Sequence, residues 1–290
     1  MVPEVNVIEV SDEETSGECQ SAAMKRSKVY QDWIKKAQVA RTGEWEMNVK
    51  FDVSKDTPTA PVFPQNVLFH DKVEDYAMSV TTTSSRNIQT AANVTVKEGM
   101  FAPCMVGSLE SQFLKMFART ANAKTILDVG TFTGMSAISF AEGALKKSPD
   151  CKVYTLEGHK PTAEVAAKIF SQCEPEINNA IELCYGDAIE WMQKTANDPD
   201  GKSFDIIFID ADKDNYIEYF AYAMGDKGGR PLLAEDGVIL VDNTLSALVF
   251  DQDDSRRTAL HLFNQHVKND KRVEQAVMTV REGISIISRV

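Results

Sequence analysis

The stretch "FDIIFIDADKDNYIEYF", residues 204–220, contains a complete passage from a strand to a helix. Its first six residues form an apolar, β-branched run that is typical of a buried strand, and residues 214–224 have helical spacing. Between the two parts lie Asp210, Asp212, Lys213 and Asp214. Such a cluster is either a solvated turn or a set of carboxylates that binds something, and the surrounding segments decide between these interpretations.

The same pattern of strands and helices repeats on both sides of this stretch. Strands are predicted at 125–129, 152–157, 181–186, 204–210 and 237–242. Helical segments are predicted between them, near 135–146, 161–171, 188–195 and 214–224. This alternation predicts an α/β fold with a parallel sheet and helices on both faces. After a helix near 255–268, two further strand candidates, 272–280 and 283–290, are close enough in sequence to pair antiparallel.

The chain divides into three parts. Residues 1–20 contain six acidic residues and no Lys or Arg, which predicts a disordered, solvated tail. Residues 21–104 combine an amphipathic helix near 22–41 with an extended, proline-rich connector. Residues 105–290 contain the predicted sheet. The first helix of that part, near 108–121, is predicted to present one apolar face made of Leu109, Phe113, Met116 and Phe117.

Composition and charge exclude several classes of protein. The net charge of the 290 residues is −12, which disfavours nucleic acid as a partner. The sequence has no apolar run of about 18 residues, so we expect no membrane span. The start of the chain lacks the features of a secretory signal, and its five cysteines are scattered and never form a CxxC pair. We therefore expect a cytoplasmic protein with free thiols.

Open parallel sheets bind their ligands beyond the carboxyl ends of the strands, so the residues that follow each strand are candidate site residues. After the first strand, Asp128 is followed by Gly130 and Gly134, which permit either close approach of a ligand or simply a tight turn. The second strand ends in Glu157, which is suited to ribose hydroxyls or is an ordinary surface acid. After the third strand, Asp187 either accepts a hydrogen bond from an adenine or caps the next helix.

The fourth and fifth strands end in groups that suit a metal ion. Asp210 follows the fourth strand, and Asp242 and Asn243 follow the fifth. Carboxylate and amide oxygens are hard ligands of the kind that Mg²⁺ accepts, and no histidine lies close to them in sequence. The alternative is that these residues are turn formers or helix caps. Their occurrence together with the glycine loop and Glu157 favours a binding site.

Five motifs occur in an order that resembles a known family: "ESQFLKMF", "ILDVGTFTGMSA", "FDIIFIDADKDNYIEYF", "GVILVDNTL" and "REGISIISRV". The resemblance covers residues 105–290 and is to the cation-dependent O-methyltransferases, which include catechol and caffeoyl-CoA O-methyltransferases. Within that family the sequence is most similar to the branch of the microbial mycosporine-pathway, gadusol-forming enzymes. The resemblance implies a Rossmann-like methyltransferase fold with a seven-stranded, mostly parallel sheet whose last strand is antiparallel. It also implies that residues 21–104 pack on this core and shape the acceptor site.

The resemblance also implies an activity and assigns residues to it. The methyl donor is S-adenosylmethionine, and the cofactor contacts are Val106, Asp128, Gly130, Ser136, Glu157, Asp187, Ala188 and Asp210. The ligands of Mg²⁺, or of Mn²⁺ or Ca²⁺, are Asp210, Asp242 and Asn243, and the catalytic residues are Asp210 and Lys213, the latter as general base. The expected acceptor is a small molecule with vicinal hydroxyls or an enediol, and the expected assembly is a homodimer. Two alternatives stay open: another acceptor class, or a protein that binds the cofactor without turnover.

Overall fold

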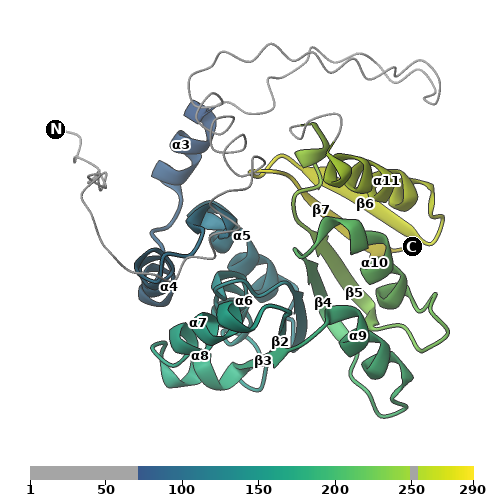
Figure 1. Ribbon diagram of the computed structural model, residues 1–290, viewed down its shortest axis with the longest axis horizontal. Helices are drawn as coiled ribbons and strands as arrows, with labels where there is room; N and C mark the ends of the chain where they lie inside the picture. The colour runs from purple at the N-terminus through teal and green to yellow at the C-terminus, as the bar shows by residue number, and fades with distance from the viewer. Residues whose placement is uncertain (1–70, 249–253) are drawn as a thin grey trace. The chain divides into compact units, whose positions relative to one another are not determined.

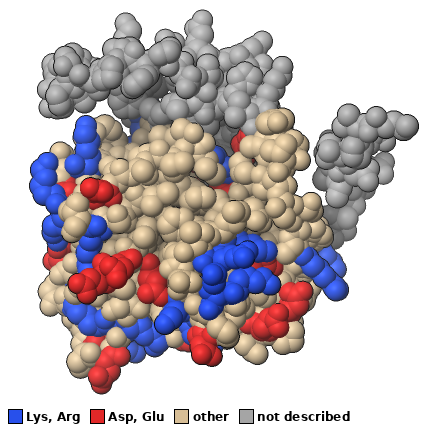
Figure 2. Space-filling model, turned by 180° about the vertical axis from the view of Figure 1, so that it is seen from behind, with Lys and Arg blue, Asp and Glu red and all other residues tan. Residues whose placement is uncertain are grey.

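The computed structural model describes residues 71–248 and 254–290 (Figure 1). The acidic tail predicted at 1–20, the helix near 22–41 and the proline-rich connector lie outside the described residues. Within the described ranges, no helix is long and apolar enough to cross a membrane. Figure 2 shows Lys and Arg side chains interspersed with Asp and Glu side chains on one face of the protein.

Within the described residues, seven strands form one sheet in the order β3-β2-β1-β4-β5-β7-β6. Strands β1 to β5 pair in parallel, whereas β7 is antiparallel to both of its neighbours, β5 and β6. This confirms the predicted sheet and its antiparallel last strand. The strands are β1 (Thr125–Val129), β2 (Lys152–Glu157), β3 (Ile181–Tyr185), β4 (Phe204–Ile209), β5 (Leu233–Val241), β6 (Val273–Met278) and β7 (Ile284–Arg289).

Helices cover both faces of this sheet, as the alternation of segments predicts (Figure 1). On β1, Ile126 packs into one core with α5 to α8, and its neighbour Leu127 packs into a second core with α9 to α11. The α-helices are α3 (Asp71–Val80), α4 (Arg86–Lys97), α5 (Gly107–Thr120), α6 (Met135–Ala144), α7 (Lys160–Phe170), α8 (Pro175–Ala180), α9 (Ala188–Asn197), α10 (Tyr216–Met224) and α11 (Ser255–Asn269). Three 3₁₀ turns are also present in the described part: η1 (Ala102–Cys104), η2 (Lys213–Asn215) and η3 (Ser246–Leu248).

The apolar face predicted for α5 is correct only in part, because Phe113 and Phe117 are half-buried against the core but do not form the centre of the buried face. The helix buries Glu110, Ser111, Leu114 and Ala118, whereas Met116 of the predicted apolar face is 58% exposed. The reason is the close approach of α5 to α6. A side chain at Gly143 of α6 would overlap the carbonyl oxygen of Lys115, and Ser111 and Ser139 share a hydrogen bond of 2.7 Å between their hydroxyls. Small and polar residues therefore replace large apolar ones at this contact.

A buried carboxylate on α6 joins the helices on this face. Glu142 is 6% exposed and accepts hydrogen bonds from the side chains of Ser85, Asn87 and Lys115. These donors belong to the start of α4 and to α5, so one carboxylate holds three helices together. Burial raises the pKa of Glu142, but the hydrogen bonds from its three partners outweigh burial and lower the pKa below its ordinary value of 4.5.

We therefore expect Glu142→Gln to destabilise the protein by about 2 kcal/mol at pH 7, since an amide disrupts a charge-assisted network. Because the folded-state pKa is depressed, the contribution of Glu142 is fully present above pH 4.5 and is lost as the pH falls through the lowered value. Urea unfolding from pH 7 down to pH 3 measures this difference. Glu176→Gln, at an exposed position on α8, is the control. An equal effect of both variants at pH 7 would contradict the account.

Candidate active site

The register of the sheet brings the predicted metal ligands together. Ile209 of β4 pairs with Val241 of β5, so the next residues, Asp210 and Asp242, lie side by side at the carboxyl edge. The backbone nitrogen of Asp242 donates to the carbonyl oxygen of Ile209 at 3.0 Å, which extends the pairing by one residue. Asp242 is 4% exposed, and Asp210 is half-buried. Two carboxylates thus share one end of the sheet.

Asn243 completes this group through a turn. Its φ is +60°, in the left-handed region that asparagine tolerates better than most residues. Its backbone nitrogen donates to Oδ1 of Asp242 at 2.6 Å. The chain therefore turns immediately after Asp242. A strained backbone conformation at such a position is typical of functional sites.

Lys213 lies against the same carboxylates. Its Nζ is 3.0 Å from Oδ1 of Asp210 and donates to the hydroxyl of Tyr216 at 2.7 Å. Tyr216 in turn donates to the backbone carbonyl of Asp242 at 3.3 Å. Burial lowers the pKa of Lys213, but the charges of Tyr216, Asp210 and Asp242 outweigh burial and raise the pKa above its ordinary value. The lysine is therefore an ammonium group in this arrangement.

The electrostatics of the carboxylate pair suit a cation. Burial, followed by the charge of Asp210, raises the pKa of Asp242 well above its ordinary value. A divalent ion would relieve this repulsion, and the donors present are the hard oxygens that such an ion accepts. The described ranges contain no group of three or more His, Cys, Asp and Glu side chains arranged to hold a metal. Within these ranges the predicted site therefore offers two carboxylates, Asp210 and Asp242, and the prediction names the amide of Asn243 as the third ligand.

Asp128, at the end of β1, is a buried carboxylate of which only one oxygen is hydrogen-bonded within the described residues. The side chain is fully buried, and its Oδ2 accepts hydrogen bonds from Ser136 at 3.0 Å and Thr155 at 2.7 Å. Its Oδ1 is buried without a hydrogen-bond partner in the described part. Burial raises the pKa of Asp128 to about 7. An ammonium group placed at Oδ1 would satisfy this oxygen, while Ser136 orients the carboxylate.

The glycine loop after β1 packs closely against the residue that follows β4. Gly130 has a φ of +107°, and a side chain there would overlap the carbonyl oxygen of Asp210. Gly130 therefore allows the ends of β1 and β4 to approach closely. The tight-turn interpretation of this glycine therefore agrees with the structure.

Gly130→Ala is expected to destabilise the protein by roughly 4 kcal/mol or more, because it combines an unfavourable φ with a backbone overlap. Gly228→Ala is a matched control: its φ is also positive, +84°, and a side chain there meets nothing within 4 Å. The control should lose only about 1 kcal/mol, the conformational part of the effect. Thermal unfolding of both variants measures this difference. Similar melting temperatures would show that the approach of Asp210 does not restrict this position.

Glu157, at the end of β2, holds the glycine loop. Its two carboxylate oxygens accept hydrogen bonds from the backbone nitrogens of Phe132 and His159, each at 2.9 Å. Phe132 has a φ of +46°, so this contact stabilises an unusual backbone conformation. A carboxylate offers about four acceptor positions, so two stay available for hydroxyl donors. Glu157 is thus more than a surface acid, and a role in binding ribose is compatible with its contacts.

The remaining predicted cofactor residues flank this edge. Asp187 is exposed and caps α9, where its Oδ1 accepts from the backbone nitrogen of Glu190 at 2.9 Å. Gly186 donates to the backbone carbonyl of Glu157 at 3.0 Å, which places the Asp187–Ala188 segment beside the end of β2. Val106, 5% exposed, lies directly before α5. The capping interpretation of Asp187 is therefore correct, and capping leaves an adenine contact possible.

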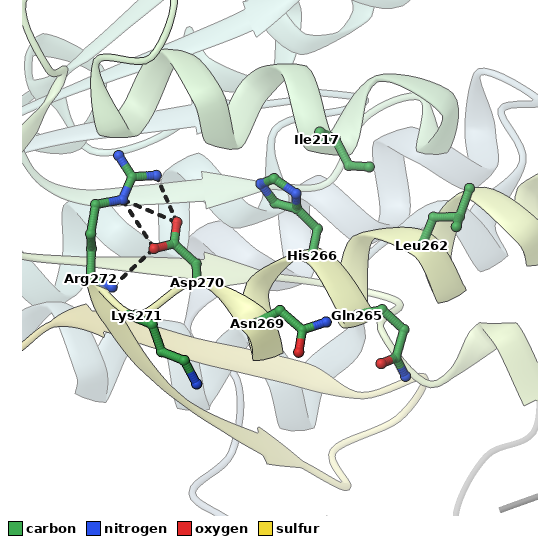
Figure 3. Close-up of a pocket in the computed structure, with 8 residues that line it drawn as sticks. All are labelled: Ile217, Leu262, Gln265, His266, Asn269, Asp270, Lys271 and Arg272. Carbon is green, nitrogen blue, oxygen red and sulfur yellow. Dashed lines mark hydrogen bonds and ion pairs between the residues drawn. The ribbon is translucent and has the colours of Figure 1, made fainter. Parts of the chain in front are cut away.

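Two surface grooves lie between α10 and α11. One has a volume of about 420 Å³ and includes Lys213, with Ile217, Ala259 and Leu262 among its lining residues. The other has a volume of about 640 Å³ and also includes Ile217 and Leu262 (Figure 3). At its far end Arg272 pairs with Asp270. The first groove leads to the predicted catalytic lysine, whereas the second contains none of the predicted site residues.

Sequence reasoning missed two groups at this site. Tyr216 accepts a hydrogen bond from Lys213. Its position three residues after Lys213 was the sequence feature that could have identified this contact. Glu110 of α5 is fully buried and neither of its oxygens has a hydrogen-bond partner in the described part. The motif "ESQFLKMF" begins with this residue, but its spacing indicated only an apolar helix face.

Comparison with known proteins agrees with this architecture. The family model described as O-methyltransferase matches residues 78–290, so the match begins before the predicted boundary at residue 105. The chain is 31% identical over 202 residues to O-methyltransferase ankF from Aspergillus thermomutatus, covering 68% of this chain and 80% of that protein. It is 28% identical over 190 residues to caffeoyl-CoA O-methyltransferase 1 from Eucalyptus globulus, covering 62% and 73%.

A solved structure gives the same result. The O-methyltransferase from Bacillus cereus in complex with SAH is 25% identical, with a TM-score of 0.64, and the match covers 76% of this chain and 97% of that one. The family model matches most of the chain. The chain therefore belongs to the O-methyltransferase family and is an enzyme of that class.

Proposed function

We propose that this enzyme transfers a methyl group from S-adenosylmethionine to one of two adjacent hydroxyls of a small molecule, with the help of a divalent cation. The observation that carries the proposal is the meeting of Asp210, Asp242, Asn243 and Lys213 at one edge of the sheet, beside the glycine loop. The SAH bound to the relative from Bacillus cereus supports the choice of cofactor.

The cofactor residues divide between its two ends. Asp128, oriented by Ser136, would hold the ammonium group of the methionine part, because its unpartnered Oδ1 needs a donor. Glu157 would accept from the ribose hydroxyls, and Asp187 and Ala188 would border the adenine. Val106, Gly130 and Asp210 would line the space between these ends. The bound cofactor supplies an electrophilic methyl group on a positively charged sulfur.

The cation would be held by Asp210, Asp242 and Asn243, and Mg²⁺ is the expected ion, with Mn²⁺ or Ca²⁺ as substitutes. When bound, it lowers the pKa of an adjacent hydroxyl and fixes the hydroxyl in place. Lys213 is the proposed proton acceptor. Its ammonium form is stabilised by Tyr216, Asp210 and Asp242, and a divalent charge beside the two carboxylates would oppose that stabilisation. Tyr216 holds Nζ of Lys213 in position.

The acceptor class follows from the neighbouring groove. The groove that contains Lys213 has a volume of about 420 Å³, and Ile217, Ala259 and Leu262 give it apolar walls. This size and character suit a small ring such as a catechol, a caffeoyl-type phenol, or an enediol like a gadusol precursor. Two neighbouring oxygens on that ring would complete the coordination of one ion. We also propose a homodimer, on the family resemblance alone.

Ligand-dependent melting temperatures test this proposal. S-adenosylmethionine at 100 times its Kd should stabilise the protein by about 2.7 kcal/mol. Mg²⁺ together with catechol should then add a further increase, whereas resorcinol, whose hydroxyls are not adjacent, should not. An equal increase with either diphenol, or with catechol in the presence of EDTA, would contradict the proposed acceptor site.

A further inference from the structure

One buried acid, Glu110, makes no side-chain hydrogen bond to the described residues. Glu110 of α5 is fully buried, and both of its carboxylate oxygens lack hydrogen-bond partners there. Glu142, the other buried glutamate of the described part, instead accepts from three side chains. Burying a carboxyl group without partners costs several kcal/mol in an apolar environment. Glu110 is therefore a group whose partner is not part of the described chain.

The start of α5, which carries Glu110, is bonded to the elements that hold the carboxylate pair. Nη1 of Arg281, in the turn between β6 and β7, donates to the carbonyl oxygen of Met105 at 2.7 Å. The same turn accepts from the backbone nitrogens of Thr244 and Leu245, at 3.1 and 2.8 Å. These two residues directly follow Asn243. One turn thus joins the segment directly before α5 to the residues that follow β5.

The charges of the carboxylate pair also act on Glu110. Burial, then the charges of Asp242 and Asp210, raise the pKa of Glu110 well above its ordinary value, and Arg281 opposes this effect. In residues 71–248 and 254–290, however, no three acids are close enough to hold one ion directly. Glu110 therefore does not form one directly coordinating group with Asp210 and Asp242.

We propose that Glu110 is a positioning residue whose carboxylate accepts hydrogen bonds from water molecules carried by the cation at Asp210, Asp242 and Asn243. This inference rests on the proposed function, because it requires the cation. Mg²⁺ and Mn²⁺ fill the positions that protein ligands leave open with water. Groups that hydrogen-bond to the ligands of a metal commonly contribute 10- to 100-fold to its affinity. The unpartnered oxygens of Glu110 offer such acceptors on the side of the site formed by α5.

The test is Mn²⁺ binding to the full chain, followed by electron paramagnetic resonance of the free ion. Glu110→Gln keeps the shape of the side chain and should weaken Mn²⁺ binding by about 10- to 100-fold. Ser111→Ala changes the adjacent buried residue, which bonds only to Ser139 in α6 and should leave the affinity within about twofold. Calorimetry with S-adenosylmethionine should give the same cofactor affinity for both variants and the wild type.

The melting temperature without metal separates a folding defect from the proposed role. Glu110→Gln should melt no lower than the wild type, because it removes a buried, unpartnered acid. If the wild type binds Mn²⁺ and Glu110→Gln binds it equally well, the role of Glu110 is wrong and the proposed function stands. Loss of cofactor affinity with unchanged Mn²⁺ affinity would also overturn it. Failure of the wild type to bind Mn²⁺ would overturn both proposals.

Discussion

Replacing Asp242 by asparagine is expected to lower the turnover number by about a thousand-fold while cofactor affinity stays nearly unchanged. A hydroxyl with a phenol-like pKa near 10 is ionised in only about one molecule in a thousand at pH 7, so loss of the cation removes most of the reactive form. Asp242 lies beside Asp210 on the metal side of the sheet edge, whereas Asp128 and Glu157 end other strands. Single-turnover kinetics and cofactor titration measure the two effects separately.

Asp205→Asn is the matched control for this variant. Asp205 lies on β4, where its carboxylate accepts from the backbone nitrogens of Lys124 and Thr125 at the opposite end of the sheet. Its replacement should affect stability and leave turnover within about threefold, because it lies far along the strand from the carboxyl edge. Near-normal turnover of Asp242→Asn in the presence of EDTA would show that Asp242 does not serve a metal ion.

Replacing Glu157 by alanine is expected to weaken S-adenosylmethionine binding by roughly 30- to 1,000-fold. If Glu157 binds the ribose as proposed, two charge-assisted hydrogen bonds are lost, a combined effect of about 2–4 kcal/mol. The variant also frees the backbone nitrogens of Phe132 and His159, so the glycine loop loses an anchor. Mn²⁺ affinity should hardly change, since the proposed metal ligands follow other strands. Calorimetry with cofactor and with Mn²⁺ tests both parts.

Glu157→Gln separates the loss of the proposed ribose contacts from the loss of the loop anchor. Glutamine keeps the length of the side chain and one acceptor oxygen, so the loop should keep part of its anchor while the charge is lost. An affinity between those of the wild type and Glu157→Ala is expected. Unchanged affinity in both variants would reduce Glu157 to a residue that shapes the loop, and would remove the main structural support for a ribose contact.

The sheet was predictable because its strands are locally distinctive. Apolar runs that are followed directly by Gly or Asp mark each of the five parallel strands, and the short separation of β6 and β7 marks their antiparallel pairing. The orientation of α5 was not predictable. Its inward face is set by the approach of α6 at Gly143, which depends on residues about 30 positions away. The short helix α8 was also missed, since six residues carry little periodicity.

The residues of the candidate site also divide into those that local sequence predicts and those that depend on distant contacts. Asp210 and Asp242 were predictable because the carboxyl ends of neighbouring parallel strands meet at one edge. Lys213 and Tyr216 lie one helical turn apart, which sequence alone makes plausible. Glu110 and Arg281 were not predictable, because their environment depends on contacts such as the one between Arg281 and Met105, which are 176 residues apart. Local patterns thus identify strand ends, and only the folded chain shows what approaches them.

The most direct test of the central claim is methyl transfer by the full chain from labelled S-adenosylmethionine to a panel of phenols. The panel pairs catechol and caffeic acid with isomers whose hydroxyls are not adjacent, each with Mg²⁺ and with EDTA. The account predicts a methylated product only from the vicinal diols, loss of that product with EDTA, and its return when excess Mg²⁺ is added. Transfer that is insensitive to EDTA, or equal for adjacent and separated hydroxyls, would contradict it.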